Sequence, residues 1–230
     1  MDASAWDERY AATGLVWGGG PNQFVEAELA ALPPGKAVDL AAGEGRNAIW
    51  LAARGWQVMA VDFSQVALDK GRRLAGPSSG SGTSSVEPGT GGAVECSGTS
   101  SVEPGTGGAV EWVRADATTW DGSGLDLAVV AYLQLPAAER RLAMRNAFRA
   151  LRAGGTFLVV AHDSTNLAEG TGGPQDPAVL YTAEDVLSDL EGEDVEVLRA
   201  ERVPRVVASA DGHGPAGTAW DALVRLRRRS

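Results

Sequence analysis

Three aspartates follow short apolar runs in the first half of the sequence. Asp39 lies in VDLAAGEGRN, Asp62 in VMAVDFS and Asp116 in WVRADATT. If these runs are parallel strands, their carboxyl ends meet at one edge of a sheet, where carboxylates can accept hydrogen bonds from a ligand's hydroxyl and amino groups. Gly43 and Gly45 form a turn between the first two aspartates, where the backbone can approach that ligand closely.

The turn fits two kinds of adenosine-containing ligand. Gly43, Gly45 and Ala48 match G-x-G-x-x-A, the pattern of nicotinamide and flavin dinucleotide sites. In dinucleotide folds, however, the strand runs almost directly into the first glycine, whereas Asp39 lies four residues before Gly43. Glu44 would also be a poor neighbour for a pyrophosphate unless it points away. An acidic turn instead suits a ligand with a cationic centre and an α-amino group, and S-adenosylmethionine has both.

Alternating strands and helices position these residues. Apolar runs predict strands at 37–41, 57–62, 112–115, 125–131 and 156–161. We expect helices over 26–32 and 47–54, a third capped by Ser64, and a fourth from Pro136 to Gly154 and Gly155. The final stretches DVEVLRAERVPRVV and TAWDALVRLRRR alternate as an antiparallel pair does. The predicted fold is α/β, a doubly wound, mostly parallel seven-stranded sheet with a C-terminal antiparallel hairpin.

Residues 76–110 differ from the rest of the chain. They are rich in Gly, Ser, Thr and Pro, and SGTSSVEPGTGGAVE occurs at 81–95 and again at 97–111. Such a repeat has too few apolar side chains to form a core. We therefore expect one domain spanning 1–230, interrupted at 76–110 by a flexible insert.

Composition excludes several classes of function. The net charge of −10 argues against a nucleic-acid surface, and no apolar run reaches the length of a membrane span. The first residues lack the pattern of a signal peptide. Cys96 and two histidines make a poor zinc set, so we expect no metal. These features predict a cytoplasmic protein that binds neither nucleic acid nor membrane, and they leave its oligomeric state open.

Several motifs together resemble one enzyme family. DLAAGEGRN, VDFS, RADATT, the final hairpin and the N-terminal WDERYAATGLVWGGGPNQFV are similar to the class I S-adenosylmethionine-dependent methyltransferases. Within that class the chain resembles the small bacterial branch related to tellurite-resistance and thiopurine methyltransferases. The resemblance spans the chain except the insert, and it implies methyl transfer from S-adenosylmethionine to a small molecule.

The resemblance assigns residues to the methionine end of the cofactor. Gly43 and Gly45 would let the backbone approach the methionine, and Asp39 would brace the turn near the amino group. Arg46 and Asn47 would hold the carboxylate. A solvated helix start is the alternative for this last pair.

Other residues would bind the nucleoside. Asp62 would accept both ribose hydroxyls, and Phe63 would lie against the adenine. Asp116 and Ala117 would contact the exocyclic amine. The structural alternatives are a helix cap for Asp62 and a turn cap for Asp116.

The N-terminal segment contains aromatic residues that suggest a lid. Tyr10 and Trp17 would lie near the methionine end, or would only anchor this segment on the core. The remaining residues that we expect at the cofactor are Ser64 and Ala131.

The acceptor side is less defined by motif. Tyr132 follows the fourth parallel strand and His162 the fifth, at the edge where ligands bind, and the Gly-rich stretch 164–177 would cover the acceptor. His162 is the better candidate base by residue type, although a hydrogen-bonded strand-end histidine is the alternative. We expect a thiol or another chalcogen nucleophile as acceptor. The alternatives are N- or O-methylation of a small metabolite, a nicotinamide-dependent oxidoreductase, and a silent cofactor-binding module.

Overall fold

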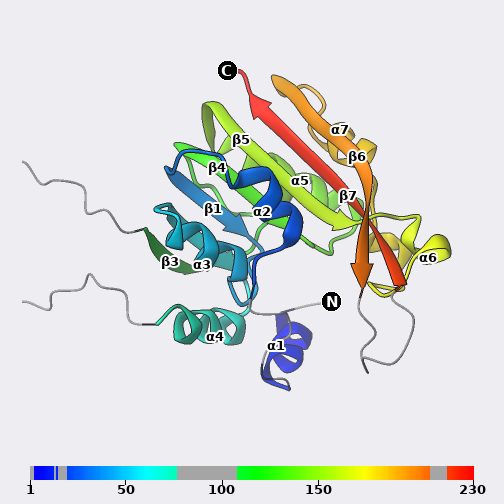
Figure 1. Cartoon of the computed structure of the whole chain (residues 1–230), viewed down its shortest axis with the longest axis horizontal. Coiled ribbons are helices and arrows are strands. Elements are labelled where there is room, and N and C mark those ends of the chain that lie inside the picture. The colour runs from blue at the N-terminus through cyan, green and yellow to red at the C-terminus, as the bar shows by residue number, and fades with distance from the viewer. Residues whose placement is uncertain (1–2, 13, 15–19, 77–107, 208–216) are drawn as a thin grey trace, which may run out of the picture.

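A seven-stranded sheet forms the centre of the molecule in the computed structural model, which describes residues 3–12, 14, 20–76, 108–207 and 217–230 (Figure 1). The strands lie in the order β3-β2-β1-β4-β5-β7-β6, and only β7 is antiparallel to its neighbours. This confirms the predicted fold class, including the hairpin at one edge. The strands are β1 Lys36–Leu40, β2 Gln57–Asp62, β3 Ala109–Arg114, β4 Leu125–Ala131, β5 Leu151–His162, β6 Val195–Val207 and β7 Gly217–Arg228.

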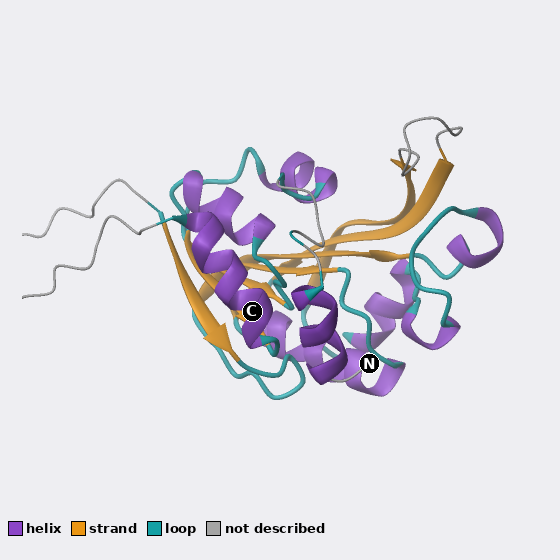
Figure 2. Cartoon of the chain, turned by 90° about the horizontal axis from the view of Figure 1, so that it is seen from below, coloured by secondary structure: helices purple, strands orange, loops and turns teal. Residues whose placement is uncertain are grey.

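Helices cover both faces of the sheet (Figure 2). Apolar side chains of α2 and α3 pack on one face, and those of α5 and α7 pack on the other. Each strand of the centre is therefore buried on both sides, as its near-continuous apolar sequence predicts. The helices are α1 Ala3–Ala11, α2 Gln23–Leu29, α3 Arg46–Ala53, α4 Gln65–Ala75, α5 Ala137–Arg149, α6 Asn166–Glu169, α7 Ala183–Asp189 and the 3₁₀ turn η1 Pro177–Val179.

Gly154 and Gly155 do not end a helix as the sequence predicted. The helix α5 stops at Arg149, and both glycines lie inside β5. The register between β4 and β5 shifts at this point, because Leu125 pairs with Leu151 while Leu127 already pairs with Thr156. Gly154 has φ 79°, a backbone angle that glycine adopts readily, so the glycines serve a bulge.

The ring of Trp112 packs between α4 and the start of α3. A Cβ atom on Gly45 would lie 2.4 Å from this ring, and one on Gly71 would lie 2.2 Å from it. Trp112 on β3 therefore occupies the space that two missing side chains leave on α4 and at the start of α3. Gly45 also has φ 72°, so its backbone favours glycine independently of the packing.

The predicted insert ends earlier than its composition suggested. Ala109 and Val110 belong to β3, where they pair with Gln57 and Val58. Residues 77–107, which include Cys96, lie outside the described residues.

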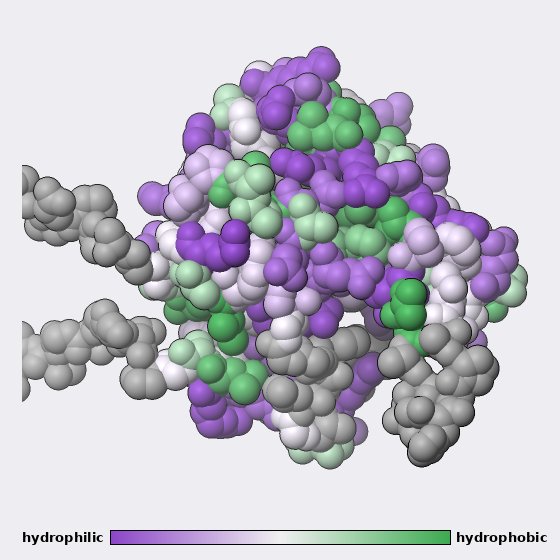
Figure 3. All heavy atoms as spheres, viewed as in Figure 1, coloured by the Kyte–Doolittle hydropathy of each residue, from purple (hydrophilic) through white to green (hydrophobic). Residues whose placement is uncertain are grey.

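The described surface exposes its large apolar side chains at separate places. Figure 3 shows hydrophobic residues in patches divided by hydrophilic ones on the face it presents. Such scattered exposure is ordinary for a folded protein. None of the described helices is both long and apolar enough for a transmembrane span. The exposed large apolar residues are Leu74, Leu142, Leu167, Val197, Leu198 and Val206.

Candidate active site

The carboxylate of Asp62 joins the two loops that follow β1 and β2. Its Oδ2 accepts a hydrogen bond of 2.8 Å from the amide of Gly43, and its Oδ1 accepts one of 2.8 Å from the amide of Ser64. Asp62 is buried, and burial raises the pKa of its carboxyl above the ordinary value although both amide bonds oppose that shift. The carboxylate still lines the pocket described next, so it can accept further hydrogen bonds from a ligand.

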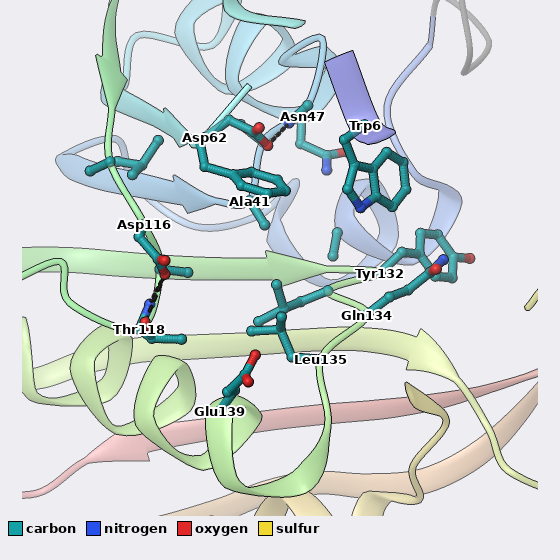
Figure 4. A pocket seen from close by; sticks show the side chains of 18 of the residues that line it. Trp6, Ala41, Asn47, Asp62, Asp116, Thr118, Tyr132, Gln134, Leu135 and Glu139 are labelled. Atoms are coloured by element: carbon teal, nitrogen blue, oxygen red, sulfur yellow. Dashed lines mark hydrogen bonds between the residues drawn. The ribbon is translucent and has the colours of Figure 1, made fainter. Parts of the chain in front are cut away.

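A pocket of about 560 Å³ lies along the carboxyl ends of β1, β2 and β4 (Figure 4). This volume is in the usual range for a small-molecule site. Asp116 and Thr118 lie at one end of it, and Trp6 and Tyr132 lie at the opposite end. The predicted cofactor residues that line it are Tyr10, Gly43, Arg46, Asn47, Asp62, Phe63, Asp116, Ala117 and Ala131.

Asp39 lies directly behind the glycine turn. Its Oδ2 accepts a hydrogen bond of 3.1 Å from the amide of Ala48, in the first turn of α3. Its Oδ1 is buried and has no hydrogen-bond partner among the described groups. Burial raises the pKa of Asp39 to about 7. Asp39 does not line the pocket, but a buried carboxylate oxygen without a hydrogen-bond partner beside the glycine turn would suit an ammonium group, such as the amino group of S-adenosylmethionine.

Glu44 does not contribute its charge to the pocket. It is buried and points to Lys70 on α4, with Nζ of Lys70 3.4 Å from its Oε1. Glu44 thus points away from the pocket, the case in which it would not oppose a pyrophosphate, and the choice of ligand depends on other residues. Gly45 likewise lies outside the pocket lining, and its conformation serves the packing of Trp112.

The helix α1 covers one end of the pocket. The rings of Trp6 and Tyr10 stack with centroids 5.6 Å apart, and both residues line the pocket. Two contacts hold α1 against α4. The hydroxyl of Ser64 donates to Asp7, and Nζ of Lys70 donates to the carbonyl of Tyr10. Tyr10 is thus both anchored on the core and placed at the site.

Ser64 and Trp17 have different outcomes from the other predicted cofactor residues. Ser64 is fully buried, caps α4 through a hydrogen bond from the amide of Ala67, and lies outside the pocket lining. Trp17 lies outside the described residues.

Asp116 has the turn-capping bonds of the structural alternative and also faces the pocket. Its Oδ1 accepts hydrogen bonds from the amide and the hydroxyl of Thr118, at 2.8 and 2.7 Å. The two roles are compatible because its carboxylate is exposed and has a second oxygen. Asn47 likewise combines two positions. Its Oδ1 accepts a hydrogen bond of 2.9 Å from the amide of Asn22, and the residue lines the pocket.

A second pocket of about 660 Å³ adjoins the first and shares Arg46, Tyr132 and Gln134 with it. His162 and residues 171–176 of the predicted covering loop line this second pocket. The rings of Tyr132 and His162 stack with centroids 4.5 Å apart. The structure therefore brings both predicted catalytic residues to one place, next to the first pocket.

Tyr132 is unsuited to act as a base. Burial and the adjacent charge of Asp221 raise the pKa of its hydroxyl well above the ordinary value. The hydroxyl stays protonated at neutral pH and donates a hydrogen bond of 2.8 Å to Asp221. A positioning role fits Tyr132 better than proton abstraction.

Some lining residues carry no sequence motif. Arg205, on β6, lines the second pocket, and Leu135 and Glu139 line the first. Asp221, on β7, lies behind the second pocket. Its only sequence signal is a charge in the apolar run AWDALV. Within the described ranges, no group of three or more His, Cys, Asp or Glu side chains is placed to hold a metal ion.

Part of the chain matches a known protein family, and its fold is similar to that of solved structures. Residues 21–75 match the family model of the tellurite resistance protein TehB. The fold is similar to TehB from Haemophilus influenzae, with 16% identity, a TM-score of 0.63, and coverage of 91% of this chain and 63% of that one. No curated protein matches the sequence.

Two further solved structures are similar over almost the whole chain. One is the N-methyltransferase NodS from Bradyrhizobium japonicum with S-adenosyl-L-homocysteine bound, at 17% identity, a TM-score of 0.65 and 100% coverage of both chains. The other was described for the conversion of a disulfide bond into a thioacetal group in echinomycin biosynthesis. It has 19% identity, a TM-score of 0.65, and coverage of 99% of this chain and 92% of that one.

These findings agree with the resemblance that the sequence motifs carry, and the similar structures confirm the fold that it implies. The sheet order agrees, because β7 is antiparallel between β5 and β6, whereas dinucleotide-binding folds have a parallel sixth strand. The oxidoreductase alternative therefore loses its support.

Replacing Asp62 with alanine should weaken cofactor binding. The change removes the acceptor of two loop amides and the expected partner of the ribose, so binding of S-adenosylhomocysteine should lose roughly 1.5–3 kcal/mol, the usual value of hydrogen bonds to a charged group. Calorimetry measures the dissociation constant. Asp126→Ala is the matched control, because Asp126 also accepts from a backbone amide, that of Lys36, at the amino end of the strands. An unchanged dissociation constant in folded Asp62→Ala would contradict the role.

Cofactor binding should weaken at acid pH through Asp39. With a pKa of about 7 in the free protein, Asp39 is increasingly neutral below that pH, and an incoming ammonium group must then displace its proton. From about pH 8 to about pH 6, the dissociation constant of S-adenosylhomocysteine should rise about tenfold. Calorimetry in buffers of different ionisation enthalpy would detect the released proton. Asp39→Asn should lose this dependence, and an equal pH slope in both proteins would rule out Asp39 as its source.

Proposed function

We propose that this chain, a class I S-adenosylmethionine-dependent methyltransferase, transfers the methyl group to a small molecule with an ionised thiol or another anionic chalcogen. The observation that carries this proposal is the second pocket, which meets the cofactor pocket at Arg46, Tyr132 and Gln134. An acceptor there would lie beside the cofactor's methionine end. The bound cofactor supplies a methyl group activated by its sulfonium.

The charge of the second pocket favours an anionic acceptor. Arg9, Arg46 and Arg205 line it together with one carboxylate, that of Asp176. Even when the buried Asp221 behind Arg205 is included, arginines outnumber carboxylates. The chain as a whole carries a net charge of −10, so this pocket differs in sign from the rest of the protein. Local positive charge in a concave site raises the concentration of anions there.

The side chains of the second pocket suit alignment better than proton transfer. Methyl transfer is an in-line displacement, so the protein mainly orients the acceptor and excludes water. An ionised thiol needs no base, and Tyr132 keeps its proton at neutral pH. Stacked on Tyr132, His162 would bound the acceptor. For a neutral amine or alcohol, His162 would instead have to accept a proton.

N-methylation is the second candidate, since NodS has this activity and the same fold. The two candidates are separated by measuring S-adenosylhomocysteine formation with three acceptors of one shape: 4-nitrothiophenol, 4-nitrophenol and 4-nitroaniline. We expect the thiolate to be methylated at least about tenfold faster than the amine, because it alone is fully anionic at neutral pH. Fastest turnover of the aniline would favour N-methylation. Binding of S-adenosylhomocysteine without turnover of any of the three would contradict a small-molecule methyltransferase of either kind.

The effect of His162→Ala should depend on the acceptor. Because a thiolate requires no deprotonation, we expect its turnover to change by less than about tenfold. A protonated acceptor should lose roughly 10²–10⁴ in turnover, the usual contribution of a positioned base. The dissociation constant of S-adenosylhomocysteine serves as the control, since His162 lines the second pocket and not the first. Full activity of the variant on every acceptor would make His162 a structural residue.

A further inference from the structure

A buried carboxylate, that of Asp221, lies behind the second pocket. Asp221 has no exposed surface and contacts three side chains that line the pocket: Tyr132, His162 and Arg205. These three residues come from the end of β4, the end of β5 and β6. One carboxylate therefore connects three separate strands of the sheet at the pocket.

The register of the sheet explains two of these contacts. His162 and Asp221 are directly opposite each other in the antiparallel pair of β5 and β7, so their side chains lie on the same face. The Nδ1 atom of His162 is 3.5 Å from Oδ1 of Asp221. On the other side, Asp221 pairs with Val203 of β6, and Arg205 lies two residues further along that strand. Its side chain is therefore the diagonal neighbour of Asp221.

Two nitrogens of the Arg205 guanidinium donate hydrogen bonds to the carboxylate of Asp221. Its Nε lies 2.6 Å from Oδ2, and its Nη2 lies 3.4 Å from Oδ1. Such paired contacts fix the plane of the guanidinium as well as its position. Burial raises the pKa of the Asp221 carboxyl, but its contacts with His162, Arg205 and Tyr132 outweigh burial and hold it below the ordinary value. Asp221 is therefore ionised at neutral pH.

The backbone of Tyr132 has an unfavourable conformation, so contacts with other residues must hold it in place. Its backbone has φ 58°, in the left-handed region that non-glycine residues seldom adopt. This angle turns the chain at the end of β4, where the amide of Tyr132 donates 2.7 Å to the carbonyl of Val160. The far end of the side chain is held by its hydroxyl, which donates 2.8 Å to Asp221. The guanidinium of Arg205 also lies 5.6 Å from the centre of the Tyr132 ring.

We propose that Asp221 is a positioning residue for the methyl acceptor: it fixes Tyr132 at the boundary between the two pockets and Arg205 in the second pocket. Tyr132 lines both pockets, so its ring sets where an acceptor can approach the cofactor. Arg205 presents the positive charge that holds an anionic acceptor. This role rests on the proposed function, in which the second pocket binds the acceptor.

Kinetics of Asp221→Asn test the role. Asparagine keeps the shape of the side chain and removes its charge, so kcat/KM for 4-nitrothiophenol should fall at least about tenfold while the dissociation constant of S-adenosylhomocysteine changes less than about twofold. Tyr132→Phe, which removes only the hydroxyl, should lower kcat/KM as well, and the double variant should lose less than the product of the two single losses. Additive losses, or wild-type kinetics in Asp221→Asn, would overturn the proposal.

Asp189→Asn is the matched control for folding. Asp189 is also fully buried and pairs with arginines, Arg140 and Arg141, but it joins α5 to α7 and lines neither pocket. The substitution Asp189→Asn should lower the melting temperature and leave kcat/KM nearly unchanged. An equal loss of kcat/KM in Asp189→Asn would mean that Asp221 acts only through stability.

A second measurement needs no acceptor. In protein labelled with 3-fluorotyrosine, the fluorine resonance of Tyr132, assigned with Tyr132→Phe, should be sharp in the wild type and should shift or broaden in Asp221→Asn. Tyr181 is the internal reference, because its hydroxyl donates 3.1 Å to the carbonyl of Leu133 and not to Asp221. An unchanged Tyr132 resonance would overturn the positioning role. If the wild type methylates none of the nitro-substituted acceptors, the proposed function fails, and this resonance still decides whether Asp221 holds Tyr132.

Discussion

The site depends first on the two hydrogen bonds that Asp62 accepts. Parallel strands leave their loops separate at the carboxyl edge, and nothing in strand pairing sets how one loop lies relative to the next. Asp62 removes that freedom by binding the amide of Gly43 in one loop and the amide of Ser64 in the other. Ser64 in turn contacts Asp7 of α1, so the N-terminal helix is tied to the same loop. A single buried carboxylate thus sets the position of a turn, a helix cap and a lid.

The cofactor half of the site could be predicted because it is local in sequence. The glycine turn and the aspartates at strand ends lie within a few residues of one another, and each strand end is visible as the close of an apolar run. The direction of the Glu44 side chain could not be predicted, since it depends on Lys70, which a linear pattern does not place. The prediction that Gly154 ends a helix was wrong for a related reason. Glycine at positive φ serves helix ends and strand bulges alike, and the choice was made by the register with β4.

The acceptor half could not be predicted to the same depth. Arg205 and the carboxylate of Asp221 behind it lie on β6 and β7, whose alternating sequences define strands but not which strand faces which. Arg205 and Asp221 become neighbours only through the register of that pair. The comparisons reflect the same division. The segment that matches a family model, 21–75, contains the glycine turn, Asp62 and Arg46, and it ends before His162 and Arg205 of the second pocket. Under the proposed function, His162 and Arg205 of the acceptor site therefore lie in the part of the chain that the family model does not match.

The connection between α4 and β3 leaves and rejoins the sheet far from this chemistry. Helix α4 starts at the carboxyl end of β2, runs back along the sheet and ends at Gly76, and β3 begins at Ala109, at the amino ends of the strands. Both pockets open at the carboxyl ends. The pockets thus lie at the carboxyl ends of the strands, and the α4–β3 connection lies at their amino ends. For protein engineering, the α4–β3 junction is accordingly the place to fuse a fluorescent reporter or a surface tether, because Gly76 and Ala109 on either side of it lie at the amino ends of the strands, opposite both pockets.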